Sequence, residues 1–219
     1  MKMLLCSMGL TNKSIENALL DLIDKSPEET TVAFVATASN MITGDKTWII
    51  DALARLKNLN FKSIEITDIS AVGKEIWQPS FEKADVIYFE GGHTYHLMRW
   101  LHKTGLSESM AALLKNKVYL GVSAGAMVTN PNLNPKLSNL VYHEEKIEYE
   151  KMDGMNLVDF HFLPHLNTPW YEKMTKENIE QLSKQTHRKI YGLDNQSALK
   201  IVGDKIEVIT EGEFCLFND

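Results

Sequence analysis

Short apolar runs alternate with longer segments of helical periodicity up to about residue 130. The apolar runs are rich in branched side chains, which is typical of buried strands. Residues 46–58 illustrate the helical pattern, because Trp48, Ile49, Leu53 and Leu56 recur at the spacing of one helix face. The predicted strands of this part are residues 1–7, 31–36, 62–69, 86–89 and 118–122, and the other predicted helices are residues 12–25, 94–103 and 107–115.

This alternation predicts the fold class. Strands that are apolar on both faces and separated by helices belong to a sheet that is covered on both sides. We therefore expect an α/β protein with an open, mostly parallel sheet and helices on both faces. In such folds the functional side chains lie beyond the carboxyl ends of the strands.

The pattern changes after about residue 130. Pro131 and Pro135 fall in a turn-rich loop, and residues 144–151 form a charged run with little periodicity. No repeat or linker divides the chain, so residues 1–219 are expected to form one domain, ending in a β-hairpin with its turn at Gly203-Asp204. The predicted elements of this part are strands at residues 157–163, 189–193, 197–202 and 205–210, and a helix at residues 171–185.

Composition narrows the classes of partner. The formal net charge is −6 and no basic stripe is present, which argues against nucleic acid and favours a small polar substrate. Cys6 and Cys215 lack the paired spacing of a metal knuckle or redox motif, so we expect buried thiols and no metal or cofactor. Residues 1–10 lack the long apolar region and the cleavage site that are typical of a signal peptide, and are expected to form a first core strand. No stretch reaches the roughly 20 apolar residues of a membrane span. A cytoplasmic location without membrane association is expected.

Gly121-Val122-Ser123-Ala124-Gly125 lies where a predicted strand gives way to the start of a helix. A serine at such a sharp turn is held out of the sheet, and the flanking glycines avoid side-chain clashes across the turn. We therefore predict Ser123 as a nucleophile, with the amide of Ala124 as a donor to an oxyanion. The alternative is a serine that only caps a helix.

Gly91-Gly92 follows another strand and is expected at the same edge of the sheet. Glycine lets a backbone amide approach a substrate closely, so Gly92 is the predicted second oxyanion donor. A plain strand-to-helix turn is the other interpretation.

A serine nucleophile needs a neighbouring base, and histidine is suited to neutral pH. Of seven histidines, His165 follows a predicted strand and Pro164, and is the expected base, with His93 in reserve. Asp194, at the end of the strand 189–193, is the favoured acid to orient the imidazole. Glu144, Glu145 and Asp159 stay open as alternatives.

Taken together, these motifs resemble the peptidase family that includes dipeptidase E and cyanophycinase. The likeness covers most of the chain: Met3-Leu4-Leu5, the Gly91-Gly92-x-Thr94 loop, the segment from Gly121 to Ala126, Pro164-His165, and Gly192-Leu193. The resemblance implies a fold like that of class I glutamine amidotransferases, with serine in place of cysteine. It also implies cleavage of short peptides or isoaspartyl-type bonds next to acidic residues.

The resemblance assigns roles residue by residue. Ser123 matches the nucleophile, His165 the base, and Gly92 and Ala124 the oxyanion donors. Asn195 stands where relatives often carry a glutamate.

Two further positions concern the substrate. Lys176 stands where dipeptidase E has a substrate-binding arginine, and lysine lacks the bidentate fork, so relaxed or altered acidic specificity is expected. His93 replaces an Asn or Asp of relatives and is expected either to touch substrate or to cap the following helix.

The predicted function is hydrolysis of short peptides through a Ser-His-acid mechanism and an acyl-enzyme, by a monomer or homodimer. One alternative is a small α/β-hydrolase esterase, in which Asp153 or Asp159 would stand between Ser123 and His165 in chain order. Another is a non-catalytic protein that binds a small molecule or peptide and whose triad has decayed.

Overall fold

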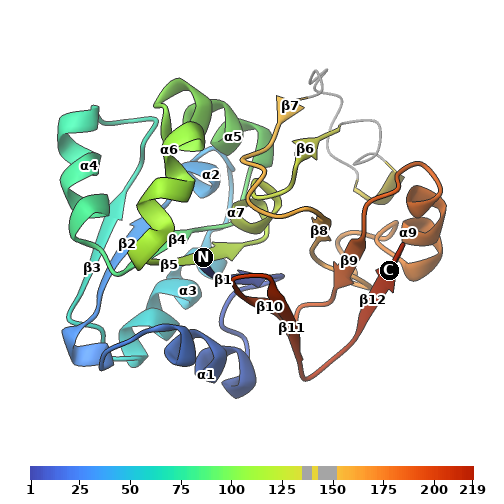
Figure 1. The fold of residues 1–219 in the computed structure, drawn as a ribbon, viewed down its shortest axis with the longest axis horizontal. Helices are drawn as coiled ribbons and strands as arrows, with labels where there is room; N and C mark the ends of the chain where they lie inside the picture. Colours follow the sequence, from blue (N-terminus) through green and yellow to red (C-terminus); the bar gives the residue numbers. More distant parts are fainter. Residues whose placement is uncertain (135–139, 143–151) are drawn as a thin grey trace.

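A computed structural model describes residues 1–134, 140–142 and 152–219, and its central feature is a seven-stranded sheet (Figure 1). The strand order is β11-β10-β1-β5-β4-β2-β3. The five strands from β1 to β3 in that order run parallel, and β10 and β11 are antiparallel, so the predicted open, mostly parallel α/β sheet is confirmed. These strands are β1 (Lys2–Cys6), β2 (Thr31–Val35), β3 (Ser63–Thr67), β4 (Val86–Phe89), β5 (Val118–Val122), β10 (Ser197–Val202) and β11 (Lys205–Thr210).

Helices cover both faces of this sheet, because successive strand side chains point to opposite sides. Leu4, Phe34 and Tyr88 pack with α1 and α3 on one face. Met3 and Phe89, from alternate positions, pack with helices α4 to α7 on the other. The helices are α1 (Lys13–Leu22), α2 (Thr37–Asn40), α3 (Thr47–Asn58), α4 (Lys74–Lys83), α5 (Thr94–Lys103), α6 (Leu106–Leu113) and α7 (Ala124–Met127), with short 3-10 turns at Pro27–Glu29 and Leu114–Asn116.

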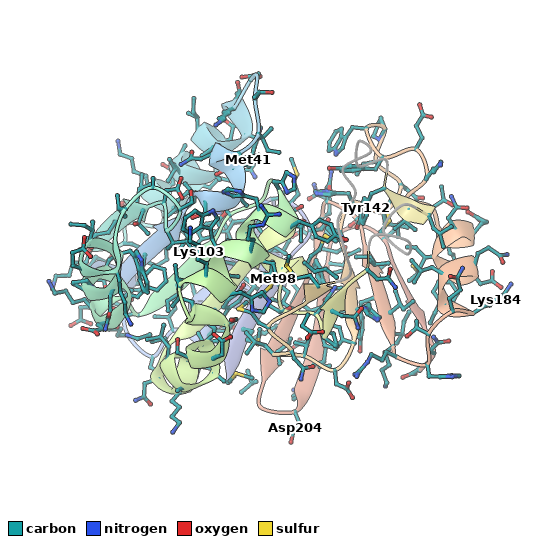
Figure 2. All side chains as sticks on the ribbon, turned by 90° about the horizontal axis from the view of Figure 1, so that it is seen from above. Met41, Met98, Lys103, Tyr142, Lys184 and Asp204 are labelled. Carbon is teal, nitrogen blue, oxygen red and sulfur yellow. The ribbon has the colours of Figure 1, made fainter. Side chains whose placement is uncertain are left out.

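A second, three-stranded sheet lies beside the first and carries the C-terminus (Figure 1). It consists of β12 (Phe214–Phe217), β9 (Ile190–Leu193) and β8 (His161–Leu163), with α9 (Lys176–Ser183) packed against β9 and β12. The hairpin of β10 and β11 forms at the predicted turn, and Asp204 projects from the edge of the molecule there (Figure 2). The chain does not end in this hairpin, because β12 follows it and returns to pair with β9.

Two predicted elements are shorter than expected. The strand predicted at 157–163 begins only at His161. The helix predicted at 171–185 begins at Lys176, because the Thr175 side chain caps it by accepting a hydrogen bond from the amide of Asn178. A small ladder joins β6 (Asn132–Leu133) to β7 (Met152–Asp153), while the charged run at 144–151 lies outside the described residues.

Among the helices of the described residues, none has both the length and the apolar character needed to cross a membrane.

Candidate active site

The turn at Ser123 has the geometry that the sequence predicts. β5 ends at Val122 and α7 begins at Ala124, and Ser123 between them has φ 48° and ψ −109°, a conformation that L-residues rarely adopt. A Cβ at Gly125 would lie 2.0 Å from the carbonyl oxygen of Phe89, so only glycine fits there. The amide of Ser123 donates to the Cys6 carbonyl at 3.0 Å, which ties the turn to β1.

His165 lies against this serine. Its Nε2 is 2.8 Å from Ser123 Oγ, and the residue is only 6% exposed. The residue follows β8 and Pro164 and has φ 70°, a strained value that local hydrogen bonds hold in place. Its amide donates to Ser7 Oγ at 2.8 Å, and Thr168 Oγ1 donates to its carbonyl at 3.0 Å. The structure therefore brings together the two residues that the sequence singled out from distant segments.

The other ring nitrogen of His165 contacts Asn195. Nδ1 lies 2.9 Å from Asn195 Oδ1, and Ser7 Oγ also donates to that oxygen at 3.4 Å. Because an amide oxygen only accepts hydrogen bonds, this contact places the ring proton on Nδ1. Nε2 is then free to accept the hydroxyl proton of Ser123.

Asp194, the favoured orienting acid, faces elsewhere. Its carboxylate accepts hydrogen bonds from the amides of Gln196 and Glu213 and from Ser197 Oγ. Asp194 therefore holds the turn between β9 and β10, while its neighbour Asn195 reaches the imidazole. The expectation that Asp194 orients His165 is corrected accordingly.

The two alternative aspartates do not take the place of Asp194. Asp159 is exposed and forms an ion pair with Arg188. Asp153, the other candidate of the esterase alternative, is exposed on β7. Glu144 and Glu145 lie outside the described residues.

The environment of His165 favours its neutral form. Burial lowers the pKa of His165 below its ordinary value of 6.5, and the hydrogen bond to Asn195 opposes this only in part. A neutral imidazole is the form that can take a proton, so the ring is suited to act as a base near pH 7.

Two tyrosines that the sequence did not single out support the imidazole. Tyr171 stacks on His165 with ring centroids 5.3 Å apart. Tyr142, labelled in Figure 2, meets Tyr171 edge-on at 5.2 Å, and its hydroxyl donates to the Pro164 carbonyl at 2.9 Å. These contacts restrict the orientation of the His165 ring in addition to its hydrogen bond with Asn195.

The glycine loop lies beside the nucleophile. Gly91 faces Ser123 so closely that a Cβ added there would be 3.2 Å from Ser123 Cβ. Gly92 has φ 130° and lies against α2, where an added Cβ would be 2.4 Å from the Ala38 carbonyl oxygen. Both residues line the cleft in front of Ser123. The predicted position of Gly92 at this edge of the sheet is therefore observed.

Ser123 and His165 open onto a cleft of about 370 Å³. Its walls come from the loop after β1, from α3, from the ends of β4 and β5, and from the segment after His165, which includes the exposed Trp170. Arg55 from α3 and Glu90 at the end of β4 also line it. Sequence reasoning missed both, although the position of Glu90 directly after an apolar strand was a usable signal.

The two predicted substrate contacts have other positions. His93 is the N-cap of α5, where its Nδ1 accepts a hydrogen bond from the amide of His96 at 3.2 Å, so the capping alternative is observed. Lys176 is exposed at the first turn of α9, and within the described residues it is not part of the cleft wall. A contact of Lys176 with substrate stays a prediction, which this position does not support. No group of three or more potential metal ligands is found in the described part of the chain.

An open α/β sheet, a serine on a strained strand-to-helix turn and a buried histidine at 2.8 Å define a serine hydrolase. Comparison with known proteins narrows this class: the chain belongs to peptidase family S51, whose sequence profile matches residues 3–209. The resemblance to the dipeptidase E family is confirmed, and the chain is a serine peptidase of the peptidase E type. The family assignment favours this function over the esterase and the non-catalytic protein.

Individual relatives agree with this assignment. An uncharacterized peptidase of Listeria monocytogenes is 29% identical over 182 residues, covering 83% of this chain and 85% of the relative. A peptidase E of Nostoc is 30% identical over 143 residues, covering 63% and 57% of the two chains. The crystal structure of a candidate peptidase E from Listeria monocytogenes has the same fold, with a TM-score of 0.78, 24% identity, and coverage of 96% and 98%.

Proposed function

We propose that this peptidase cleaves short peptides through a Ser123–His165–Asn195 triad and an acyl-enzyme. The observation that carries the proposal is the continuous set of contacts from Ser123 Oγ to His165 Nε2 at 2.8 Å and from His165 Nδ1 to Asn195 Oδ1 at 2.9 Å.

In this mechanism Ser123 Oγ attacks the peptide carbonyl carbon while its proton moves to His165 Nε2. The tetrahedral intermediate collapses when the imidazolium returns the proton to the leaving amine. Water then attacks the acyl-enzyme with His165 again acting as base, which frees the acid product and regenerates the hydroxyl.

The negative oxygen of the tetrahedral intermediate needs hydrogen-bond donors. The amides of Gly92 and Ala124 are the proposed donors, because Gly92 lines the same cleft as Ser123, and Ala124 directly follows Ser123 and opens α7. The strained φ of Ser123 supports this arrangement, since it turns the side chain away from the sheet and toward the cleft.

Asn195 orients the imidazole without neutralising it. A carboxylate at this position would balance the imidazolium that forms during catalysis, whereas an amide supplies only a dipole. The proposed triad therefore fixes the tautomer of His165, but stabilises the imidazolium less than a triad with a carboxylate would.

Arg55 supports a preference for peptides that carry a carboxylate. The half-buried guanidinium lines the cleft and forms no ion pair within the described residues. A bidentate fork of this kind suits a carboxylate. Arg55 thus offers the cationic contact that Lys176, outside the cleft, does not.

Labelling with a fluorophosphonate probe tests the nucleophile. The wild-type protein should gain the mass of one phosphonyl group, and Ser123→Ala should gain none, while Ser109→Ala, a change on the exposed face of α6, should label like the wild type. A library of dipeptides with mass-spectrometric detection then tests turnover. Unchanged labelling of Ser123→Ala, or equal dipeptide hydrolysis by it, would rule out the proposed triad.

A further inference from the structure

Glu90 is a buried carboxyl group in the wall of the catalytic cleft. It follows β4, is only 2% exposed, and lines the same cleft as Ser123 and His165. The proposed reaction makes no use of it. A charged side chain buried at such a place needs a compensating partner or a function.

In the part of the chain that the structure describes, Glu90 accepts hydrogen bonds only from neutral groups. The Tyr88 hydroxyl donates to Oε2 at 2.9 Å, and the Gly91 amide donates to Oε1 at 2.6 Å. No ion pair to Glu90 is formed within the described residues, and Arg55 acts on it only at longer range. Each carboxylate oxygen still has a lone pair for a further donor.

Burial makes the ionised form of the Glu90 carboxyl group unfavourable. Burial raises the pKa of Glu90 to about 7, even though both hydrogen bonds and Arg55 oppose the shift. A cationic group that enters the cleft would compensate the carboxylate, because an ion pair is stronger where water is excluded. Glu90 thus lines the cleft as a carboxyl group that forms no ion pair with the described residues.

Glu90 lies close to Ser123, and this position limits which cationic group of a substrate could bind to it. Its Oε1 accepts a hydrogen bond from the amide of Gly91, and Gly91 lies so near Ser123 that a Cβ added to it would be 3.2 Å from Ser123 Cβ. A cation held there must be close to the carbonyl that Ser123 attacks. The α-amino group of a peptide's first residue is two bonds from that carbonyl, whereas a lysine ammonium stands at the end of a four-carbon stem.

We propose that Glu90 binds the free α-amino group of the substrate, so that the enzyme selects unblocked peptides and cleaves the bond after their first residue. This inference rests on the proposed function of Ser123 and adds a residue that determines specificity. With Arg55 in the same cleft, Glu90 would let the site recognise both charges of a short zwitterionic peptide.

Binding to the Ser123→Ala protein tests Glu90 without any turnover. Titration calorimetry at pH 8, where Glu90 is ionised, should show Ala-Ala binding at least 10-fold more tightly than N-acetyl-Ala-Ala. Adding Glu90→Gln, which keeps the shape and an acceptor oxygen, should weaken Ala-Ala about 10- to 100-fold and leave the acetylated peptide unchanged. Tyr88→Phe is the matched control, because it removes one hydrogen bond but keeps the charge, and should preserve the preference for the free amine.

The outcomes are distinguishable. Glu90→Gln that still prefers Ala-Ala over its acetylated form would overturn the inference and assign Glu90 to the support of Gly91 alone. Tight, Glu90-dependent binding of N-acetyl-Lys-Ala would also overturn it, by assigning the site to a side-chain ammonium. Fluorophosphonate labelling of Ser123 in the Glu90→Gln protein reports separately on the nucleophile, so loss of the proposed function would not be mistaken for loss of this contact.

Discussion

Replacing Asn195 by aspartate tests the neutral third member of the triad most directly. The aspartate carboxylate has the shape of the asparagine amide, and one of its oxygens can take the place of Oδ1 at 2.9 Å from His165 Nδ1. Ser7 Oγ, which donates to the same oxygen, can keep that hydrogen bond. The substitution therefore adds a negative charge beside the imidazole with little change in packing.

The magnitude follows from that distance. At 2.9 Å and an effective dielectric constant of about 20, the attraction between carboxylate and imidazolium is about 6 kcal/mol. If taking a half-buried carboxylate partly out of water costs about 4.6 kcal/mol, the net gain is about 1.4 kcal/mol. That gain corresponds to about one pKa unit for His165 and about a tenfold increase in the rate of the acylation step.

The assay is the pH profile of kcat/KM on a cleaved dipeptide, together with the rate of fluorophosphonate labelling. Burial holds the pKa of His165 below 6.5, so wild-type activity should fall only as the pH drops below that value. In Asn195→Asp the acidic limb should move up by about one pH unit, because the base is protonated at higher pH, and the plateau rate should rise. Asn195→Leu, which removes the acceptor, should lower the plateau about 10- to 100-fold. An unmoved acidic limb in Asn195→Asp, or full activity in Asn195→Leu, would refute the role of Asn195.

Three further predictions concern stability and follow from the same region. Asp194→Ala should lower the free energy of unfolding by about 2 kcal/mol in urea titrations, through loss of its hydrogen bonds to the turn, and a protein as stable as the wild type would contradict this. Gly125→Ala should lower it by about 3 kcal/mol or prevent folding, because its Cβ would meet the Phe89 carbonyl, as expression and circular dichroism would show. Glu90 binds its proton more tightly in the folded than in the unfolded chain, so its contribution falls by up to about 3 kcal/mol as the pH rises from about 4.5 through 7. Glu90→Gln should remove that part of the pH dependence, and equal slopes for the two proteins in urea titrations between pH 5 and 8 would exclude it.

Much of the sheet could be predicted because its signals are local. β4, β5 and α5 have the predicted bounds, since the two apolar strand runs give way to Glu90 and Ser123, and α5 begins directly after its cap residue His93. α4 was missed because Pro79 stands inside it, although Trp77 and Phe81 form its buried face. Tertiary packing of those two rings outweighs the local preference against a helix.

The candidate site was predicted in part for a related reason. Ser123 and His165 each directly follow a strand, and a functional side chain is expected at such a place. Their proximity depends on how the second sheet packs beside the first, because β5 and β8 belong to different sheets. The choice between Asp194 and Asn195 depends on which way two adjacent side chains point from one turn, and no pattern in the sequence records that direction. Asp194 was predicted because a histidine base commonly has a carboxylate partner. In the structure the Asp194 carboxylate instead accepts hydrogen bonds from the backbone amides of Gln196 and Glu213.

The charges of the cleft have a consequence for how the substrate takes part in catalysis. A triad with a neutral third member stabilises its imidazolium weakly, yet the carboxylate of Glu90 lines the same cleft. A free α-amino group paired with Glu90 would neutralise that carboxylate, and a blocked peptide would leave it without a counter-ion. The first residue of the substrate therefore sets both the position of the scissile carbonyl and the electrostatic balance around Ser123. Substitution of Glu90 should then change both selectivity and rate, because Glu90 is the proposed contact with the substrate. Substitution of Asn195, which contacts His165, should change the rate without changing selectivity.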